Sequence, residues 1–326
     1  MKTDFPIDAV ITWVDGDDPA HIAKREKYGS STLFKTEDIA GLTRYKCLGE
    51  IFYCIASINK FASWIRKIYI VTDAQNPNVE PYIKEHFPNG YIPMEIVDHK
   101  VIFDGYHKYL PTFNSISIES MTWRIPGLSE YYLEFNDDLI LQTNVSPSDF
   151  FTPDGKPVCY AQKKSALIVA LTRQIKYWYN GRRKVSYKQT MVNALKRMER
   201  PTSFILKVHH TPKSLRKSFF ENYYKNHHEA LEENISHRFR DASQFNPQQL
   251  MFLTMYQNGE CELKSYYPDL LYIQCREDDE YIQKKLEVFR TKPNAKFICI
   301  NSMDKATERG SKMLVKWIES FLWGVS

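Results

Sequence analysis

The chain has 326 residues, of which 43% are hydrophobic and 25% charged, with a formal net charge of +5. These values are ordinary for a soluble globular protein of one large domain, or of one domain with an insertion. No segment reaches the ~18 uninterrupted apolar residues of a membrane-spanning helix, the first residues lack the apolar core of a signal peptide, and the six cysteines form no C-x-x-C pair that would indicate zinc or redox chemistry. We therefore expect a cytoplasmic protein.

The first half of the chain alternates strand-like and helix-like segments. Apolar residues 9–14 predict a strand over 7–14 that ends in the acidic cluster Asp15-Gly16-Asp17-Asp18. Helical spacing of apolar residues then predicts a helix over 44–61. The following segments predict strands over 66–73 and 92–97 and a helix over 115–123. This alternation is typical of a mostly parallel sheet with helices on both faces.

An apolar run over 131–141 is interrupted by Asn136-Asp137-Asp138 and then resumes. We expect strands over 131–136 and 139–142, with the two acids between them. Two adjacent carboxylates are costly to bury without a partner, and a divalent cation at a strand end would neutralise them. Asp137 and Asp138 are therefore predicted metal ligands.

Several acids follow apolar runs and would meet at the edge of the sheet where strands end. They are Asp15, Asp17, Asp73, Asp137 and Asp138. Hard oxygen ligands suit Mg²⁺ or Mn²⁺ holding a diphosphate. For Asp17 or Asp18 alone, a turn or cap role is the favoured alternative.

The segment from Tyr160 to Lys217 contains fifteen Lys or Arg residues and one acid, Glu199. Such a bias favours a polyanion, an anionic lipid surface or phosphorylated substrates, and the alternative is a solvated helical face. We predict a core over 1–160, a basic helical insertion over 161–245, and a part over 246–326 that completes the core. Within these parts we expect helices over 175–200, 214–235, 247–258 and 305–323 and a strand over 296–300.

Basic side chains and histidines gather late in the chain, at His209-His210, Arg216 and His237-Arg238-Phe239-Arg240. Arginine can clamp the oxygens of a phosphoryl group in transfer, and a nearby histidine can accept the proton of an attacking hydroxyl. An ordinary basic surface patch explains the same residues equally well on composition alone.

The order of these motifs resembles the Stealth family, which holds bacterial capsular-polysaccharide sugar-phosphate transferases and the catalytic part of an animal lysosomal-enzyme phosphotransferase. One departure is Asn301-Ser302, where the family has Asn-Asp. The resemblance covers nearly the whole chain, through 7–19 (IDAVITWVDGDDP), 64–73 (WIRKIYIVTD), 96–99 (IVDH), 110–114 (LPTFN), 124–130 (RIPGLSE), 135–138 (FNDD), 150–162, His210-Thr-Pro, Arg216, 237–240 (HRFR) and 297–301 (FICIN).

The resemblance implies a glycosyltransferase-A-like or Rossmann-like fold and transfer of a sugar-1-phosphate from a UDP-sugar to a hydroxyl of a glycan acceptor, with release of UMP. It places Asp137 and Asp138 on the family's paired acids. By this reading the catalytic residues are His210, Arg240, Asp15 and Arg124, and the substrate-binding residues are Trp13, Asp17, Asn114, Arg216 and Arg238.

The sequence thus predicts a phosphotransferase of surface-polysaccharide synthesis that uses Mg²⁺ or Mn²⁺. Its basic segment would hold a growing anionic glycan, or dock on the inner membrane leaflet beside a lipid-linked acceptor. A conventional glycosyltransferase that releases UDP is the nearest alternative. A non-catalytic polyanion-binding protein leaves the acid clusters unexplained, and no nucleic-acid-binding module is recognisable.

Overall fold

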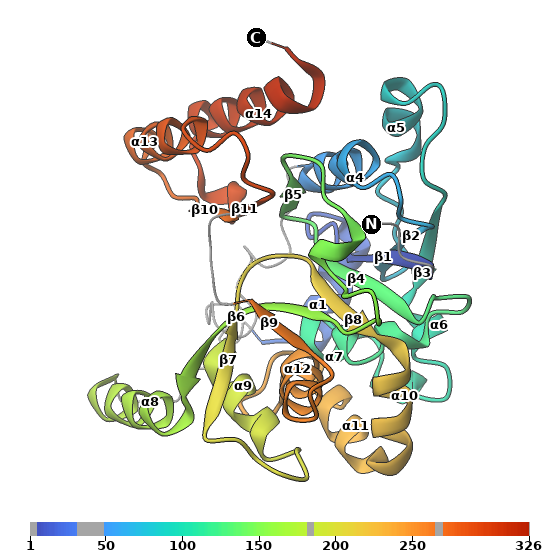
Figure 1. The fold of residues 1–326 in the computed structure, drawn as a ribbon, viewed down its shortest axis with the longest axis vertical. Helices are drawn as coiled ribbons and strands as arrows, with labels where there is room; N and C mark the ends of the chain where they lie inside the picture. The colour runs from blue at the N-terminus through green and yellow to red at the C-terminus, as the bar shows by residue number, and fades with distance from the viewer. Residues whose placement is uncertain (1–4, 31–48, 181–185, 265–269, 326) are drawn as a thin grey trace.

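The computed structural model describes residues 5–30, 49–180, 186–264 and 270–325. Its main sheet has five strands in the order β3-β2-β1-β4-β8 (Figure 1). The strands are β1 (Ile7–Thr12), β2 (Ile68–Thr72), β3 (Met94–Asp98), β4 (Tyr131–Asn136) and β8 (Lys213–Arg216). The first four are parallel and β8 runs antiparallel to β4. The predicted α/β class with a mostly parallel sheet is confirmed.

Helices cover both faces of this sheet because its strands are apolar on both sides. In β1, Ala9 and Ile11 belong to one apolar cluster and Val10 to the other. The first cluster includes α4 (Glu50–Phe61), α13 (Asp279–Arg290) and α14 (Glu308–Trp323). The second includes α9 (Tyr187–Leu195), α10 (Lys217–Asn226), α11 (His228–Ile235) and α12 (Pro247–Gln257). Figure 1 shows α4 and α14 above the sheet and α10 to α12 below it.

A second sheet follows the order β10-β11-β5, from β10 (Leu270–Gln274), β11 (Phe297–Asn301) and β5 (Leu139–Leu141). The predicted strands on either side of Asp137-Asp138 are both present, but they belong to different sheets. β4 pairs with β1, whereas β5 pairs antiparallel with β11. The two acids consequently lie at the junction of the two sheets.

A third sheet, β7-β6-β9, is built from β6 (Val158–Ser165), β7 (Phe204–Val208) and β9 (Glu262–Lys264). Two helices, α8 (Ala166–Asn180) and α9, connect β6 to β7. The helices expected over 175–200 are therefore present, although α8 begins earlier and residues 181–185 lie outside the described part.

The helix predicted over 214–235 is wrong at its start, because 213–216 form β8. Ser214 and Leu215 are fully buried where β8 pairs with β4, so pairing with a distant strand overrides the local preference. The predicted division at 160 and 245 stays a prediction. β8 falls in the predicted insertion yet forms the edge of the main sheet, and β9, from the predicted last part, pairs with β6.

Shorter elements connect these layers. Of the helix predicted over 44–61, residues 44–48 lie outside the described part, and α4 covers Glu50–Phe61. None of the described helices combines the length and the apolarity needed to cross a bilayer. The remaining helices are α1 (Pro19–Tyr28), α5 (Glu80–His86), α6 (His99–Ile102) and α7 (Ser115–Glu119), with short 3-10 turns η2 (His107–Tyr109), η3 (Thr122–Arg124), η4 (Pro147–Asp149) and η5 (Met303–Lys305).

Candidate active site

A cleft of about 460 Å³ opens at the edge of the main sheet where the parallel strands end. Residues that directly follow β1, β2, β3 and β4 line it, together with the end of β11 and the starts of α4 and α7. Side chains from separate parts of the sequence converge here: Trp13, His21, Glu50, Asp73, His99, Thr112, Ser115, Glu119, Asp137, Asp138, Arg240, Asn301, Ser302 and Lys305. This is the position at which α/β sheets bind ligands.

The sheet junction holds Asp137 and Asp138 at the cleft wall. The Ile300 N–H donates to the Asp138 carbonyl (3.1 Å) and so fixes the turn against β11. Asp138 Oδ2 accepts from Asn301 Nδ2 (3.3 Å) and Cys299 Sγ (3.5 Å). Its second oxygen, Oδ1, is buried and has no hydrogen-bond partner among the described residues. One carboxylate oxygen is therefore left for a ligand.

Burial makes this acid pair electrostatically costly. Burial, followed by the charges of Asp138 and Glu50, raises the pKa of Asp137 well above its usual value. Burial also raises the pKa of Asp138, partly offset by Cys299, Asn301 and the charge of Lys213. A bound cation would remove this cost, because it favours the ionised carboxylates.

Other residues of the cleft also have unmet hydrogen bonds. Trp13 Nε1, His99 Nδ1 and Thr112 Oγ1 are buried with no partner within the described ranges, and all three side chains line the cleft. Burial lowers the pKa of His99 to about 4, so the ring is neutral at pH 7. Buried polar atoms normally have partners, so a polar ligand is expected to complete these.

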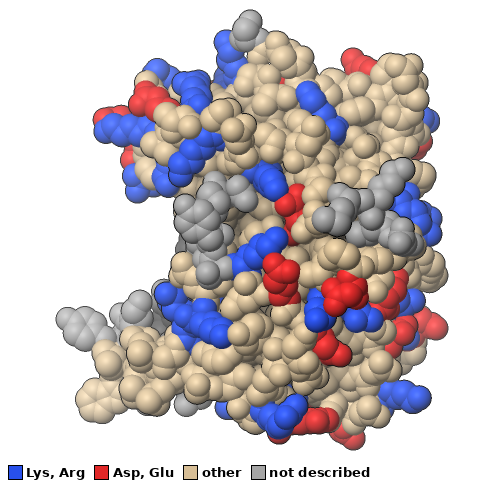
Figure 2. Space-filling view, in the orientation of Figure 1, with Lys and Arg blue, Asp and Glu red and all other residues tan. Residues whose placement is uncertain are grey.

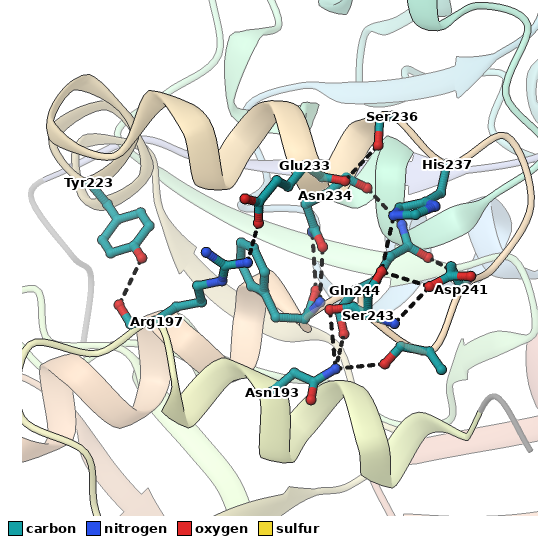
Figure 3. A network of polar contacts seen from close by, with 12 residues as sticks. Asn193, Arg197, Tyr223, Glu233, Asn234, Ser236, His237, Asp241, Ser243 and Gln244 are labelled. Atoms are coloured by element: carbon teal, nitrogen blue, oxygen red, sulfur yellow. Dashed lines mark hydrogen bonds and ion pairs between the residues drawn. The ribbon is translucent and has the colours of Figure 1, made fainter. Parts of the chain in front are cut away.

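Arg240 reaches the cleft from a loop that follows α11. Its Nη2 donates to Ser115 Oγ at 2.7 Å, at the start of α7. Figure 3 shows the polar network that fixes this loop. Asn193 Nδ2 donates to the carbonyls of Ala242 (2.8 Å), Ser243 (3.2 Å) and Gln244 (2.8 Å), so α9 holds the loop from one side.

Asn114, at the start of α7, also holds this loop. It is fully buried, and its Nδ2 donates to the carbonyls of His237 (3.0 Å) and Phe239 (3.0 Å) and to Gln244 Oε1 (2.8 Å). The structure thus places this predicted substrate ligand behind the cleft wall, where it positions the segment that carries Arg240.

His210 lies beyond the cleft rim on the side of Asp138. Its ring stacks on Tyr272 with 5.2 Å between centroids, and Tyr272 pairs with Cys299, which contacts Asp138. His210 is exposed at the surface of the molecule. Desolvation by the neighbouring side chains, and then the charges of Lys213 and Lys207, lower its pKa to about 4. The imidazole is therefore neutral at pH 7.

Of the eleven predicted site residues, Trp13, Asp137, Asp138 and Arg240 meet in the cleft, whereas the other seven lie outside its lining. Asp15 Oδ1 accepts from the exposed Asp17 N–H (3.0 Å), and the Asp15 N–H donates to Gln75. The predicted cap role of Asp18 is confirmed, because Oδ1 accepts from the Ala20 N–H (2.8 Å) at the start of α1.

The three other predicted arginines each donate hydrogen bonds to protein groups near them in the fold. Arg124 donates to the Ile102 carbonyl (2.7 Å), and Arg216 donates to Glu130 Oε1 (2.9 Å). Arg238 donates to the Leu110 carbonyl (3.2 Å), and its guanidinium lies over the Tyr28 ring. Their placement favours structural roles.

Several residues of the site were not predicted from the sequence. Glu50, Glu119, His21, His99 and Lys305 all line the cleft. His99 could have been found, since it directly follows the third parallel strand. The other four stand at helix or turn positions with no distinctive pattern. Lys213 was not predicted either, and its charge lowers the pKa values of both Asp138 and His210.

A metal site here would draw only two ligands from the acid pair. No set of three or more His, Cys, Asp or Glu side chains in the described ranges is arranged around a metal position. Mg²⁺ is commonly held by one or two carboxylates, substrate phosphates and water. The acid pair and the free Asp138 oxygen fit that pattern.

Sequence comparison places two long stretches of the chain in conserved regions of known proteins. Residues 5–32 match Stealth protein CR1, conserved region 1, and residues 44–159 match Stealth protein CR2, conserved region 2. These matches confirm the predicted resemblance over the segments that carry Trp13, Asp137 and Asp138.

Several proteins similar to this chain are named polysaccharide phosphotransferases. The chain is 31% identical to an exopolysaccharide phosphotransferase of Lactiplantibacillus plantarum, over 73% of this chain and 72% of that protein. It is 31% identical to a capsular polysaccharide phosphotransferase of Haemophilus influenzae, over 76% of this chain and 64% of that one. A receptor polysaccharide phosphotransferase of Streptococcus oralis is 40% identical over 46% of this chain, which spans only 43% of that protein.

Solved structures with a similar chain path are more distant. Mouse xyloside xylosyltransferase 1 aligns over 91% of this chain and 98% of its own with a TM-score of 0.42. The galactosyltransferase LgtC aligns over 96% and 95% with a TM-score of 0.45, and both are 10% identical to this chain. The sequence matches carry the assignment, and by them the chain belongs to the Stealth family.

Proposed function

We propose that this protein transfers a sugar-1-phosphate from a UDP-sugar to a hydroxyl of a glycan acceptor, in the synthesis of a surface polysaccharide. The observation that carries the proposal is that Asp137, Asp138 and Arg240 line one cleft. The names of the relatives support phosphotransfer over transfer of the sugar alone.

Asp137 and Asp138 would hold Mg²⁺ or Mn²⁺ against the diphosphate of the donor. Such a cation supplies neutralisation of charge on the phosphate oxygens. The buried Asp138 Oδ1 with no partner among the described residues, and the pKa values raised by burial, support this assignment. The nucleoside would lie toward Trp13, His99 and Thr112, where buried polar atoms lack partners in the described structure.

Arg240 would stabilise the phosphoryl group in transfer. The acceptor oxygen forms a bond to the phosphorus that carries the sugar, and the bond from that phosphorus to the bridging oxygen breaks. UMP leaves with that oxygen. A guanidinium held by Ser115 and by a loop fixed on two sides can stabilise the spread negative charge without rearranging.

His210 would accept the proton of the attacking hydroxyl. The neutral ring can do so at pH 7, and the exposure of His210 beside Tyr272 supports an acceptor that approaches from that side. A pKa of about 4 makes it a weak base, so positioning of the acceptor would contribute more than proton transfer.

The released nucleotide tests the proposal. The whole chain is incubated with a panel of UDP-sugars, Mg²⁺ and an acceptor glycan, and the nucleotide product is identified by chromatography. UMP supports sugar-1-phosphate transfer, whereas UDP would identify a conventional glycosyltransferase. Asp137→Ala should abolish release with the fold intact. Asp154→Ala removes an exposed acid outside the cleft lining and should retain nucleotide release. Full activity of Asp137→Ala would disprove the metal assignment.

A further inference from the structure

Helix α8 carries an exposed apolar stripe. Leu167, Ile168, Leu171, Ile175 and Trp178 are all more than half exposed, and Trp178 reaches 84%. At about 100° per residue these five positions fall within an arc of about 100°. They therefore form one continuous apolar surface along the helix, of the kind that marks an interaction site.

The opposite side of α8 is attached to the molecule. Ala166 and Val169 pack against the second apolar cluster, and the Ala166 N–H donates to the Ser203 carbonyl (2.9 Å). Figure 1 shows α8 projecting from the body at the lower left, beyond β6 and β7. The stripe is thus held outward on an anchored helix, and no described part of the chain covers it.

The charges around α8 indicate what covers the stripe. Lys163 and Lys164 are exposed at the end of β6, directly before the helix, and Lys207 is exposed on neighbouring β7. In Figure 2 the projecting helix is largely tan, and Lys or Arg side chains gather beside it. Two copies joined through this face would bring two basic surfaces together, so self-association is disfavoured.

We propose that α8 docks on an anionic lipid surface, with its apolar stripe at the boundary of headgroups and acyl chains. Amphipathic helices with Leu, Ile and Trp on one side and lysines nearby bind such surfaces through apolar burial and electrostatic attraction together. An exposed tryptophan suits this boundary, because its ring is apolar and its N–H is polar.

This placement has a consequence for the cleft. Ser165 pairs with Phe204 beside α8, and Ala161 pairs with Val208, the residue before His209-His210. Four residues of strand span about 13 Å. When α8 is docked, the end of β7 that precedes His210 would lie close to the headgroups, where a lipid-linked acceptor would lie. This consequence rests on the proposed function, but the docking itself does not.

Vesicle flotation of the whole chain tests the docking without any substrate. Wild type should float with vesicles of phosphatidylglycerol and phosphatidylcholine, but not with phosphatidylcholine alone, and binding should fall in high salt. Leu171→Gln combined with Ile175→Gln should lower the partition coefficient about tenfold, since two side chains leave the apolar boundary. Val288→Gln, which alters a side chain of similar exposure on α13, should bind like wild type.

Tryptophan quenching gives a second readout. Brominated phosphatidylglycerol vesicles should quench the fluorescence of wild type, and Trp178→Phe should lose most of that quenching. Equal flotation of wild type and the double variant would overturn the proposal, as would equal binding to neutral vesicles. A dimer in light scattering that the double variant abolishes would identify the stripe as an interface between copies instead.

Discussion

The cleft and α8 leave opposite kinds of group without a partner. In the cleft, polar atoms of Trp13, His99, Thr112 and Asp138 are buried with no hydrogen bond in the described structure. On α8, large apolar side chains are exposed to water. Both arrangements cost free energy in the isolated chain, so each indicates the chemistry of a missing partner. The buried polar atoms of the cleft indicate a polar, charged ligand. The exposed apolar side chains of α8 indicate contact with the apolar boundary of a lipid surface.

The largest expected effect is a loss of nucleotide release that leaves the function of α8 unchanged. Asp138→Asn keeps the shape of the side chain but removes the charge that a cation requires. We expect a loss of about 10³-fold in nucleotide release. Binding to anionic vesicles should be unchanged. A loss of vesicle binding in this variant would show that the two regions are coupled through the fold.

Arg240→Gln should have the next largest effect. The variant removes a cation from the cleft while Gln can still contact Ser115, so we expect release to fall about 10²-fold. Steady-state kinetics should place most of the loss in kcat, because the phosphoryl charge spreads during transfer. Arg290→Gln, an exposed arginine at the end of α13, is the control. Equal kcat values for both variants would contradict the role given to Arg240.

Asn114→Ala tests the support behind the cleft. The substitution removes three hydrogen bonds to the Arg240 loop, although Gln244 Oε1 still accepts from the Asp241 N–H and the His237 carbonyl from Ser117 Oγ. We expect the free energy of unfolding to fall by about 2 kcal/mol, measured by urea denaturation. Asn294→Ala, at an exposed turn, should change little. A variant of normal stability but lower activity would instead assign Asn114 to substrate binding.

A buried acid near the cleft predicts a dependence of stability on pH. Gln248 Nε2 donates to Glu134 Oε1 (2.5 Å) and to Glu119 Oε2 (3.0 Å). Burial, followed by the charge of Glu119, raises the pKa of Glu134 to about 8. The folded protein therefore holds a proton that the unfolded chain loses above its usual pKa near 4.5.

The stabilisation from this proton is complete below pH 4.5 and is lost as the pH rises to about 8. Glu134→Gln cannot ionise, so its stability should decline less over that window, by at most about 1.4 kcal/mol per pH unit. Urea unfolding of both proteins at several pH values measures the difference. Parallel curves would show that Glu134 is ionised in the folded protein.

Much of the fold was predictable where a signal is local. β1, β2 and β3 are short β-branched runs, and α12 and α14 carry caps or apolar spacing that the residues themselves display. The Asp137-Asp138 pair stood out because two acids interrupt an apolar run. β8 and the separate sheets of β4 and β5 were not predictable, because each depends on which distant strand is its neighbour.

The amino-acid sequence by itself determined the order of strands and helices, the acids that follow the strands, the basic bias of residues 160–217 and the resemblance to the Stealth family. Only the tertiary structure decided which of the predicted residues meet. It brought Trp13, Asp137, Asp138 and Arg240 to one cleft. It paired Arg124, Arg216 and Arg238 with protein groups outside that cleft. The physical reason is that hydrophobic periodicity is a property of neighbours in the chain, whereas hydrogen bonding and burial depend on neighbours in space.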